Sequence, residues 1–490
     1  MASGITNKPV EMSISIFSVA VFRIIFVTLV LALSATACTQ NKLPIIKSTK
    51  DAISIKDGEG AKKSGWRLNS NLKPDIYNAQ LIDGKPHKVI FITDVDSISF
   101  MVEEGNKYDF IIQKGEELYY TQIVGKRHIP AAVFDKEYQS AHRGKIFVEV
   151  PEVYELVNVA LSLTPTLSQT QYMVYKDSDY YARMVQWFDK HRSHPLIGSL
   201  EKVVQKELVH YVKLKSNGYA FKFDNNSRIV QSKIYDRIGF WGSNDLREYL
   251  DQMQSFSDDS NFREFYKQNA KTYQDQITFY RDTANIAGMV DWLDKNFPNS
   301  KSYDAYKVIF SPLVYGTQNA AWFESNGFKE LQAHVNFPYP WERKDKSGRK
   351  IKMKKKTDTL LRTVTVFTEI NHGYINPEAE KYTDRILEAA ADQDKWVDRS
   401  INPYYNGGMA VFLEYMNWGL IDLLANDLLP AGDHGIVMDS INKQMVKGRG
   451  FRQFNEFSKN LLKLYRNRKP GQTIADLYPQ IIEWFENNKP

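Results

Sequence analysis

TVTVFTEINHGYINP, residues Thr363–Pro377, is an apolar stretch that carries one carboxylate and one imidazole. Glu369 and His372 stand three residues apart, so an α-helix places both side chains on the same face. The apolar periodicity predicts that this helix spans Asp358–Gly373, with Gly373 as its C-cap and Asn376-Pro377 as the stop. A carboxylate and an imidazole in so apolar a helix need partners, so this helix carries either a functional site or core residues whose polar groups are satisfied.

The residue before Glu369 departs from a metal-binding pattern. Thr368 occupies the place of the first histidine in the motif HExxH. In that motif two histidines one turn apart bind zinc, and the glutamate takes a proton from the metal-bound water. A third ligand comes from a later helix, and Glu414 is the candidate here. It is the first acid in the apolar helix predicted over Gly407–Leu424, where it is costly without a cation, a metal or a histidine beside it.

The residues leave four interpretations of this site open. In the first, Glu369, His372 and Glu414 are ordinary core residues whose polar groups are satisfied by their neighbours. In the second, a zinc site has degenerated, and His372 and Glu414 are paired by hydrogen bonding. In the third, another residue replaces the missing ligand, and His434 is the nearest spare histidine downstream. In the fourth, Glu369 joins His372 and Glu414 as a ligand, which gives a carboxylate-rich site for a different metal.

Several segments, taken in order, resemble an uncharacterised family of bacterial lipoproteins that is described only as a domain of unknown function. They are VPEVYELVNVALSLT (Val150–Thr164), HPLI (His194–Ile197), SPLVYG (Ser311–Gly316), TEINHGYINP (Thr368–Pro377) and FLEYMNWG (Phe412–Gly419). The resemblance implies a zincin-like core of the gluzincin type, with zinc as the cofactor. It implies Glu369 as general base and His372 and Glu414 as metal ligands. Thr368 departs from the family pattern at the first ligand position, which puts metal binding and catalysis in question.

Two adjacent tyrosines precede the second helix of the expected site. Tyr404 or Tyr405 is a candidate for the hydroxyl that stabilises a transition state, as tyrosines do in several zincins. The alternative is that both side chains pack at the start of the helix.

The N-terminal region predicts export and lipidation. Arg23 precedes the apolar run Ile24–Leu33, and small residues and the only cysteine, Cys38, follow it. This is the layout of a secretory signal peptide, and the run is short for a membrane span. A cysteine after small residues resembles a bacterial lipoprotein signal, which implies cleavage before Cys38 and acylation of its thiol; a plain secretory signal is the alternative. Thr39, in place of Asp, favours the outer membrane.

The sequence pattern divides the chain into four parts of an α+β protein. Residues 1–37 are predicted as the signal peptide and residues 38–72 as a polar, flexible tether. Short β-branched and aromatic runs predict a small β-domain of hairpins over residues 73–144. Helical spacing predicts a large, mainly helical, zincin-like domain over residues 145–490.

Within the helical domain, strands are predicted over Ala305–Val314 and Leu331–Phe337, on either side of a loop rich in Gly, Asn and Ser. Zincins carry an edge strand above the active-site cleft, which binds extended substrate by strand addition. A strand followed by the helix with Glu369 and His372 fits that order.

Charge and composition exclude other classes of function. The 490-residue chain has a formal charge of +6, which is too weak an excess to indicate nucleic-acid binding. The densest basic stretch, Arg343–Lys356, has no aromatic residues among its lysines, and it predicts either a solvated loop or a contact with anionic lipid. No glycine-rich phosphate loop or cysteine-based metal site is present in the sequence.

Two hypotheses about function follow. The first is a metallopeptidase-like hydrolase at the cell envelope, with a degenerate or altered metal site, which acts on or binds peptides. The second is a non-catalytic binding or scaffold lipoprotein that holds a peptide or an envelope protein. The trio of Glu369, His372 and Glu414 favours the first, and Thr368 favours the second.

Overall fold

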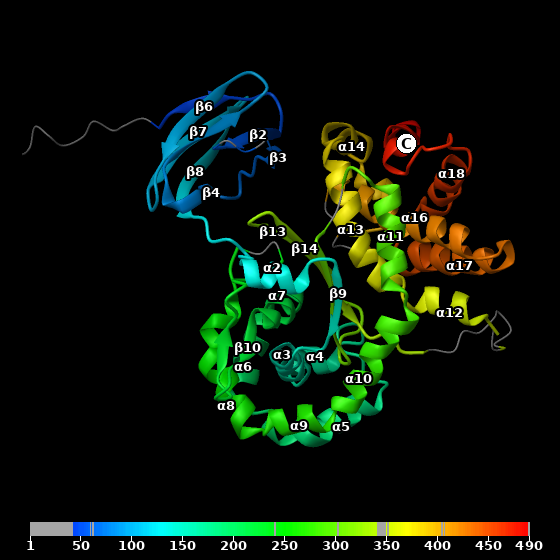
Figure 1. Cartoon of the computed structure of the whole chain (residues 1–490). Coiled ribbons are helices and arrows are strands. Elements are labelled where there is room, and N and C mark those ends of the chain that lie inside the picture. Colours follow the sequence, from blue (N-terminus) through cyan, green and yellow to red (C-terminus); the bar gives the residue numbers. More distant parts are fainter. Residues whose placement is uncertain are drawn as a thin grey trace, which may run out of the picture. The chain divides into compact units, whose positions relative to one another are not determined.

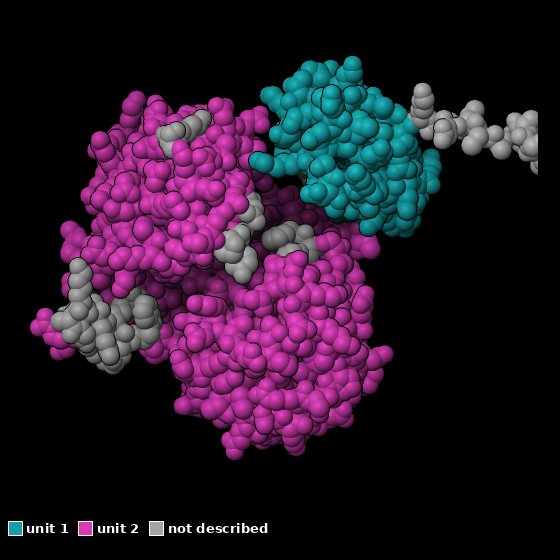
Figure 2. All heavy atoms as spheres, turned by 180° about the vertical axis from the view of Figure 1, so that it is seen from behind, with its two compact units in different colours: residues 1–128 teal, residues 129–490 magenta. Residues whose placement is uncertain are grey.

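Figure 1 shows the computed structural model of the chain, which describes residues 43–58, 60, 63–239, 242–300, 303–340, 349, 352–402, 405 and 407–488. The predicted signal peptide, Cys38, Tyr404 and most of the basic stretch lie outside these residues. The chain divides into two compact units between His128 and Ile129 (Figure 2). Within the described residues, no helix has the length and apolar character needed to cross a membrane.

Unit 1 consists of two four-stranded β-sheets packed on a common core. The sheet orders are β1-β7-β8-β4 and β3-β2-β5-β6. The strands are β1 (Ile45–Lys47), β2 (Ala52–Asp57), β3 (Lys63–Arg67), β4 (Asp75–Leu81), β5 (His87–Ile92), β6 (Ser97–Val102), β7 (Lys107–Lys114) and β8 (Glu117–Arg127), with a 3₁₀ turn at Ile82–Gly84.

Side chains that alternate along each strand form this core. In β8, Tyr119 and Ile123 are buried, whereas Leu118 and Tyr120 between them are exposed. Phe91 of one sheet and Phe110 of the other meet edge to face, with ring centroids 4.9 Å apart. The hairpins β5–β6 and β7–β8 confirm the predicted hairpin pattern, because the strands within each pair are antiparallel neighbours.

The predicted tether is wrong from Ile45 onward. β1, β2 and β3 all lie within residues 38–72, and β1 and β2 pair with β7 and β5 of the two sheets. Ile53 and Ile55 are buried in the core, while the polar residues around them face outward and make the segment look like a linker. Unit 1 also ends at His128, whereas the sequence predicted a boundary at residue 144.

Unit 2 is built around a second four-stranded sheet, in the order β13-β14-β12-β9. Its strands are β9 (Lys145–Glu149), β12 (Ala305–Ser311), β13 (Asn319–Ser325) and β14 (Phe328–Asn336). β9, β12 and β14 run parallel, and β13 is an antiparallel edge strand. The expected loop between the two predicted strands therefore contains this edge strand, which a tight turn with Asn326 and Gly327 at positive φ connects to β14.

Helices cover both faces of the sheet in unit 2 and form the rest of its core (Figure 1). Those before β12 are α2 (Lys136–His142), α3 (Glu152–Ser162), α4 (Pro165–Gln169), α5 (Asp179–Phe188), α6 (Pro195–Val204), α7 (Val209–Asn217), α8 (Leu250–Asp259), α9 (Phe262–Gln268), α10 (Ala270–Thr278) and α11 (Ile286–Asn296). Those after β14 are α12 (Lys355–Arg362), α13 (Val364–Glu380), α14 (Thr383–Ala389), α15 (Gln393–Trp396), α16 (Gly408–Leu428), α17 (Ala431–Lys443), α18 (Phe454–Arg466) and α19 (Tyr478–Asn487). A small antiparallel hairpin is formed by β10 (Phe221–Phe223) and β11 (Ile229–Gln231).

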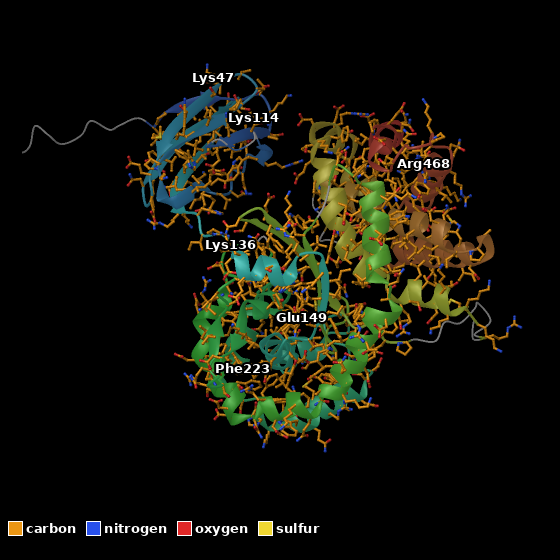
Figure 3. All side chains as sticks on the ribbon, viewed as in Figure 1. Lys47, Lys114, Lys136, Glu149, Phe223 and Arg468 are labelled. Carbon is orange, nitrogen blue, oxygen red and sulfur yellow. The ribbon has the colours of Figure 1, made fainter. Side chains whose placement is uncertain are left out.

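The elements observed confirm the expected α+β class, with a β unit ahead of a mainly helical unit. One face of the sheet in unit 2 packs against α13. The opposite face holds a buried polar network in which Lys307 lies 3.9 Å from both Glu149 and Glu330. Figure 3 shows Glu149 at the end of β9, among the helices of unit 2.

Helix α13 does not stop at Gly373, as the sequence predicted, but continues through Pro377 to Glu380. Proline at position 377 has no N–H group for the carbonyl of Gly373, four residues earlier. The Tyr303 hydroxyl donates to that carbonyl over 3.1 Å, which satisfies it from outside the helix. Gly373 is therefore a contact residue and not a cap: a Cβ there would lie 2.3 Å from Leu331 Cδ1 on β14.

We expect Gly373→Ala to destabilise unit 2 by roughly 1–3 kcal/mol, because the added methyl group overlaps a packed side chain. Denaturant unfolding followed by tryptophan fluorescence measures this change. Gly435→Ala is the matched control, because a Cβ at this glycine of α17 meets no atom within 4 Å. Alanine there should be neutral or stabilise the helix by about 0.5–1 kcal/mol. Equal stability of the two variants would contradict the close contact at Gly373.

Candidate functional site

The site lies where α13 packs against α16, and a buried amide joins the two helices. Asn371 of α13 is fully buried, and its Nδ2 donates to the backbone carbonyl of Asn417 on α16 over 3.1 Å. This bond fixes the positions of the two helices relative to each other, so that His372 on α13 and Glu414 on α16 face each other.

His372 is held by an amide at each ring nitrogen. Its Nδ1 lies 3.1 Å from Oδ1 of Asn376, one turn further along α13. Its Nε2 lies 2.8 Å from Nδ2 of Asn417. Because an amide nitrogen donates and an amide oxygen accepts, Nε2 faces a donor and Nδ1 faces an acceptor. The Nε2 lone pair, which would coordinate a metal, therefore has a hydrogen-bond donor.

Glu414 lies between an imidazole and a guanidinium. One carboxylate oxygen is 3.7 Å from Nε2 of His372, and the other is 2.9 Å from a terminal nitrogen of Arg449. Arg449 follows η7 (Gln444–Gly448), a single π-helical turn after α17. Burial alone would lower the pKa of Arg449, but Glu414, Tyr405 and Glu369 together outweigh burial and hold that pKa above its ordinary value. The sequence predicted a cation, a metal or a histidine beside Glu414, and the structure places both Arg449 and His372 there.

Aromatic rings surround the Arg449 guanidinium. Its carbon lies 4.9 Å from the ring centroid of Trp418 and 5.5 Å from those of Tyr405 and Phe451. It also donates a hydrogen bond to the Tyr405 hydroxyl. Burial, and then the charge of Glu414, raise the pKa of Tyr405, so its proton is retained. Tyr405 is therefore part of the site, while Tyr404 lies outside the described residues.

Glu369 completes the polar cluster from α13. Burial raises its pKa to about 7; the nearby His372 opposes this rise, and the Glu414 carboxylate adds to it. Lys215 and Arg449 also act on Glu369 electrostatically and favour its ionised form. A carboxyl group with this pKa exchanges protons near neutral pH, which is the property of a general acid or base.

Lys215, on α7, approaches the cluster from the other side of the edge strand. It is fully buried, and its Nζ donates to the Thr317 carbonyl over 2.8 Å and to Asn319 Oδ1 over 3.3 Å. Burial lowers the pKa of Lys215 to about 7, and the charge of Glu369 opposes that shift. Lys215 thus connects the start of β13 to the electrostatics of Glu369.

Two of the candidate residues do not contribute a ligand. Thr368 is buried, and its hydroxyl donates to the Thr365 carbonyl of its own helix over 2.8 Å. His434 is buried on α17 near the backbone of Asp422, eight residues beyond Glu414 on α16. Eight residues of helix span about 12 Å, so His434 does not take the place of the missing histidine.

The donors present do not fit zinc. A zincin-type site needs three ligand atoms directed at one point, and here each atom in question has a protein partner. The Thr368 hydroxyl is bonded to its own helix, His372 Nε2 faces Asn417, and Glu414 faces Arg449. Among the described residues, no three His, Cys, Asp or Glu side chains are grouped so as to hold a metal ion.

Sequence reasoning missed several functional neighbours of the trio. Asn371 and Asn417 carry a usable signal, because buried amides in apolar helices need partners. Arg449 and Lys215 carry none: Lys213, two residues before Lys215, pairs with Asp245 at the surface instead. Only the packing of α7 distinguishes the fully buried Lys215 from the partly exposed Lys213.

Comparisons with known proteins indicate no function for this chain, so the geometry of the site is the basis for a proposal. No protein-family model, curated protein or solved structure matches the chain.

We expect Glu369 and Lys215 to give the stability of unit 2 two opposite dependences on pH. Between about 4.5 and 7 folded Glu369 keeps a proton that the unfolded chain has lost, so the free energy of unfolding falls as pH rises. Between about 7 and 10.5 unfolded Lys215 is charged and folded Lys215 is neutral, so this free energy rises again.

Urea unfolding at pH 4.5, 7 and 10 tests these signs. Relative to the natural chain, the free energy of unfolding of Glu369→Gln should rise by on the order of 1–2 kcal/mol between pH 4.5 and 7. That of Lys215→Met, also relative to the natural chain, should fall by a similar amount between pH 7 and 10. Burial also raises the pKa values of Glu155 and Asp422 to about 7. Both groups are present in every chain, so their contributions to the pH dependence cancel when two chains are compared. Glu380→Gln, an exposed position on α13, is the control. Differences that do not vary with pH would contradict the assignment.

Proposed function

We propose that the chain is an exported lipoprotein, anchored through Cys38 to the bacterial outer membrane, whose helical unit binds extended peptides without cleaving them. In this proposal unit 2 keeps a zincin-like layout but holds an internal cation where a zincin holds zinc. The ion pair of Glu414 with Arg449, at 2.9 Å, is the observation that carries the proposal.

The ion pair supports a non-catalytic role because it stabilises the site without a metal. A buried carboxylate without a partner is strongly destabilising, and the guanidinium supplies the charge that removes this penalty. The Asn417 amide is hydrogen-bonded to Nε2 of His372, the nitrogen that would coordinate a metal. Both groups would have to move before the residues inherited from an HExxH-type site could bind zinc.

Edge strand β13 supports peptide binding. It lies at the open side of the sheet, runs antiparallel to β14, and packs beside α13, the helix with Glu369 and His372. An edge strand has unpaired backbone groups that an extended peptide can pair with. Trp322 on this strand is 42% exposed and offers an apolar contact to a bound side chain.

A metallopeptidase-like hydrolase is the second candidate function, and one observation favours it. The pKa of Glu369, about 7, suits a group that takes up and returns a proton at neutral pH. This alternative requires that peptide binding displace Arg449 from Glu414, and cleavage of the bound peptide distinguishes it from the first proposal.

Zinc analysis of the purified mature protein tests the internal-cation proposal. We expect less than stoichiometric zinc in the natural chain and in Thr368→His, because Arg449 still pairs with Glu414. The double variant Thr368→His, Arg449→Met should bind about one zinc ion, since zinc then meets three ligand side chains and an uncompensated carboxylate and has only the neutral Asn417 amide to displace. Stoichiometric zinc in the natural chain, or none in the double variant, would contradict the proposal.

Hydrogen exchange tests peptide binding at the edge strand. A mixed pool of unstructured decapeptides should slow amide exchange in β13, Asn319–Ser325, without losing mass to cleavage. The β10–β11 hairpin of the same unit is the internal control and should exchange at an unchanged rate. Protection that is absent from β13, or equal in the control hairpin, would contradict strand addition.

A further inference from the structure

An apolar stripe crosses the outward face of the sheet β1-β7-β8-β4 in unit 1. Ile45 of β1 pairs with Ile111 of β7, which pairs with Tyr120 of β8, so the three side chains form one line across three strands, in which Ile111 is buried at 8% exposure between two exposed neighbours. Leu118 lies on the same face because it is two residues from Tyr120 on β8. Ile76 of β4 pairs with Gln122, which is also two residues from Tyr120, so Ile76 lies on this face as well. Ile45 is 53% exposed, Ile76 47% and Leu118 39%.

The stripe borders a hollow of about 360 Å³ on the same sheet. Leu43, Pro74 and Tyr120 are among the residues that line it. The lining also contains Asp109 and Gln122, whose side chains hydrogen-bond to each other over 2.7 Å. The hollow therefore has apolar walls and a polar pair that is already satisfied.

The other sheet of unit 1 has no comparable stripe in its described outward positions along β6. These are Ser97, Ser99 and Met101, while the alternate residues face the core. On the strands of unit 1, Ile45, Ile76 and Leu118 are exposed on the first sheet, whereas Met101 is exposed on the second, where Ile90 and Ile92 of β5 share its face and are partly buried. Isolated exposed apolar residues are normal on a protein surface, but a continuous stripe marks a contact surface.

Basic residues accompany the stripe. Lys47, Lys107 and Lys126 occupy outward positions on β1, β7 and β8, and Asp109 is the acidic residue among the outward positions of these described strands. Figure 3 shows Lys47 on this part of unit 1. Exposed aliphatic side chains with lysines beside them suit the boundary between acyl chains and anionic headgroups.

We propose that this face of unit 1 lies on the lipid surface to which the chain is anchored, with its aliphatic side chains in the headgroup region. The inference rests on the proposed acylation of Cys38, because the anchor determines which surface is near. Cys38 precedes Leu43 at the hollow by five residues, which span at most about 18 Å. An anchored chain therefore keeps the stripe within reach of phospholipid headgroups.

The test uses the full lipidated chain in phosphatidylethanolamine–phosphatidylglycerol vesicles that contain nitroxide-labelled lipid. Cys38 is the only cysteine, and acylation blocks its thiol, so Ile76→Cys and Met101→Cys each carry a single fluorophore. Ile76 lies on β4, at the opposite edge of the sheet from β1, which separates contact with lipid from mere closeness to the anchor. We expect the lipid to quench the fluorophore at position 76 at least about threefold more than that at position 101.

Equal quenching at the two positions would overturn the proposal, provided that intact mass shows the acyl chains. Absence of the acyl mass would instead refute the anchored lipoprotein itself. The same fluorophores on the Cys38→Ser chain, without vesicles, identify a third outcome. A shielded fluorophore at position 76 in that sample would mean that the face contacts a second copy of the chain, and lipid contact would be rejected.

Discussion

The close approach of α13 to β14 is the constraint on which the candidate site depends. A Cβ at position 373 would lie 2.3 Å from Leu331 Cδ1, so only glycine allows the helix to lie this near the sheet. The Tyr303 hydroxyl satisfies the Gly373 carbonyl that Pro377 leaves unpaired, and the helix continues for another turn past the expected stop. This position brings the middle of α13, with Glu369, beside the edge strand and against α16.

Once the helices are in place, the need to compensate buried charge decides the chemistry of the site. Unit 2 compensates buried carboxylates in two places, each time with a cation among aromatic rings. Lys307 lies within 5.2–5.8 Å of four ring centroids and 3.9 Å from two carboxylates on one face of the sheet. Arg449 plays the corresponding part beside Glu414 and three rings at the α13–α16 contact. The difference lies in Glu369, whose pKa near 7 leaves this second cluster able to exchange a proton.

Lys215 gives the site a connection to the edge strand that a helix pair alone would not have. Its amine is bonded to Thr317 and Asn319 at the start of β13, and it shares an electrostatic interaction with Glu369. A change in the charge of Glu369 therefore acts on the group that fixes the beginning of this strand. In the proposed function, this lysine couples peptide binding at the strand to proton exchange at Glu369.

The sequence by itself determined the order of the elements and the two helices of the site, because hydrophobic periodicity is a local property. It located the hairpins of unit 1, the strands β12 and β14, and the helix around Glu414. It also identified Glu414 as an acid that needs a cation, a metal or a histidine beside it. Tertiary structure decided which cation that is, because Arg449 and Lys215 look like any surface residue until packing buries them. It likewise placed β1 to β3 in the sheets, turned the expected loop into edge strand β13, and made Gly373 a contact and not a cap. In each case the partner lies far away in sequence, so no local pattern could have predicted it.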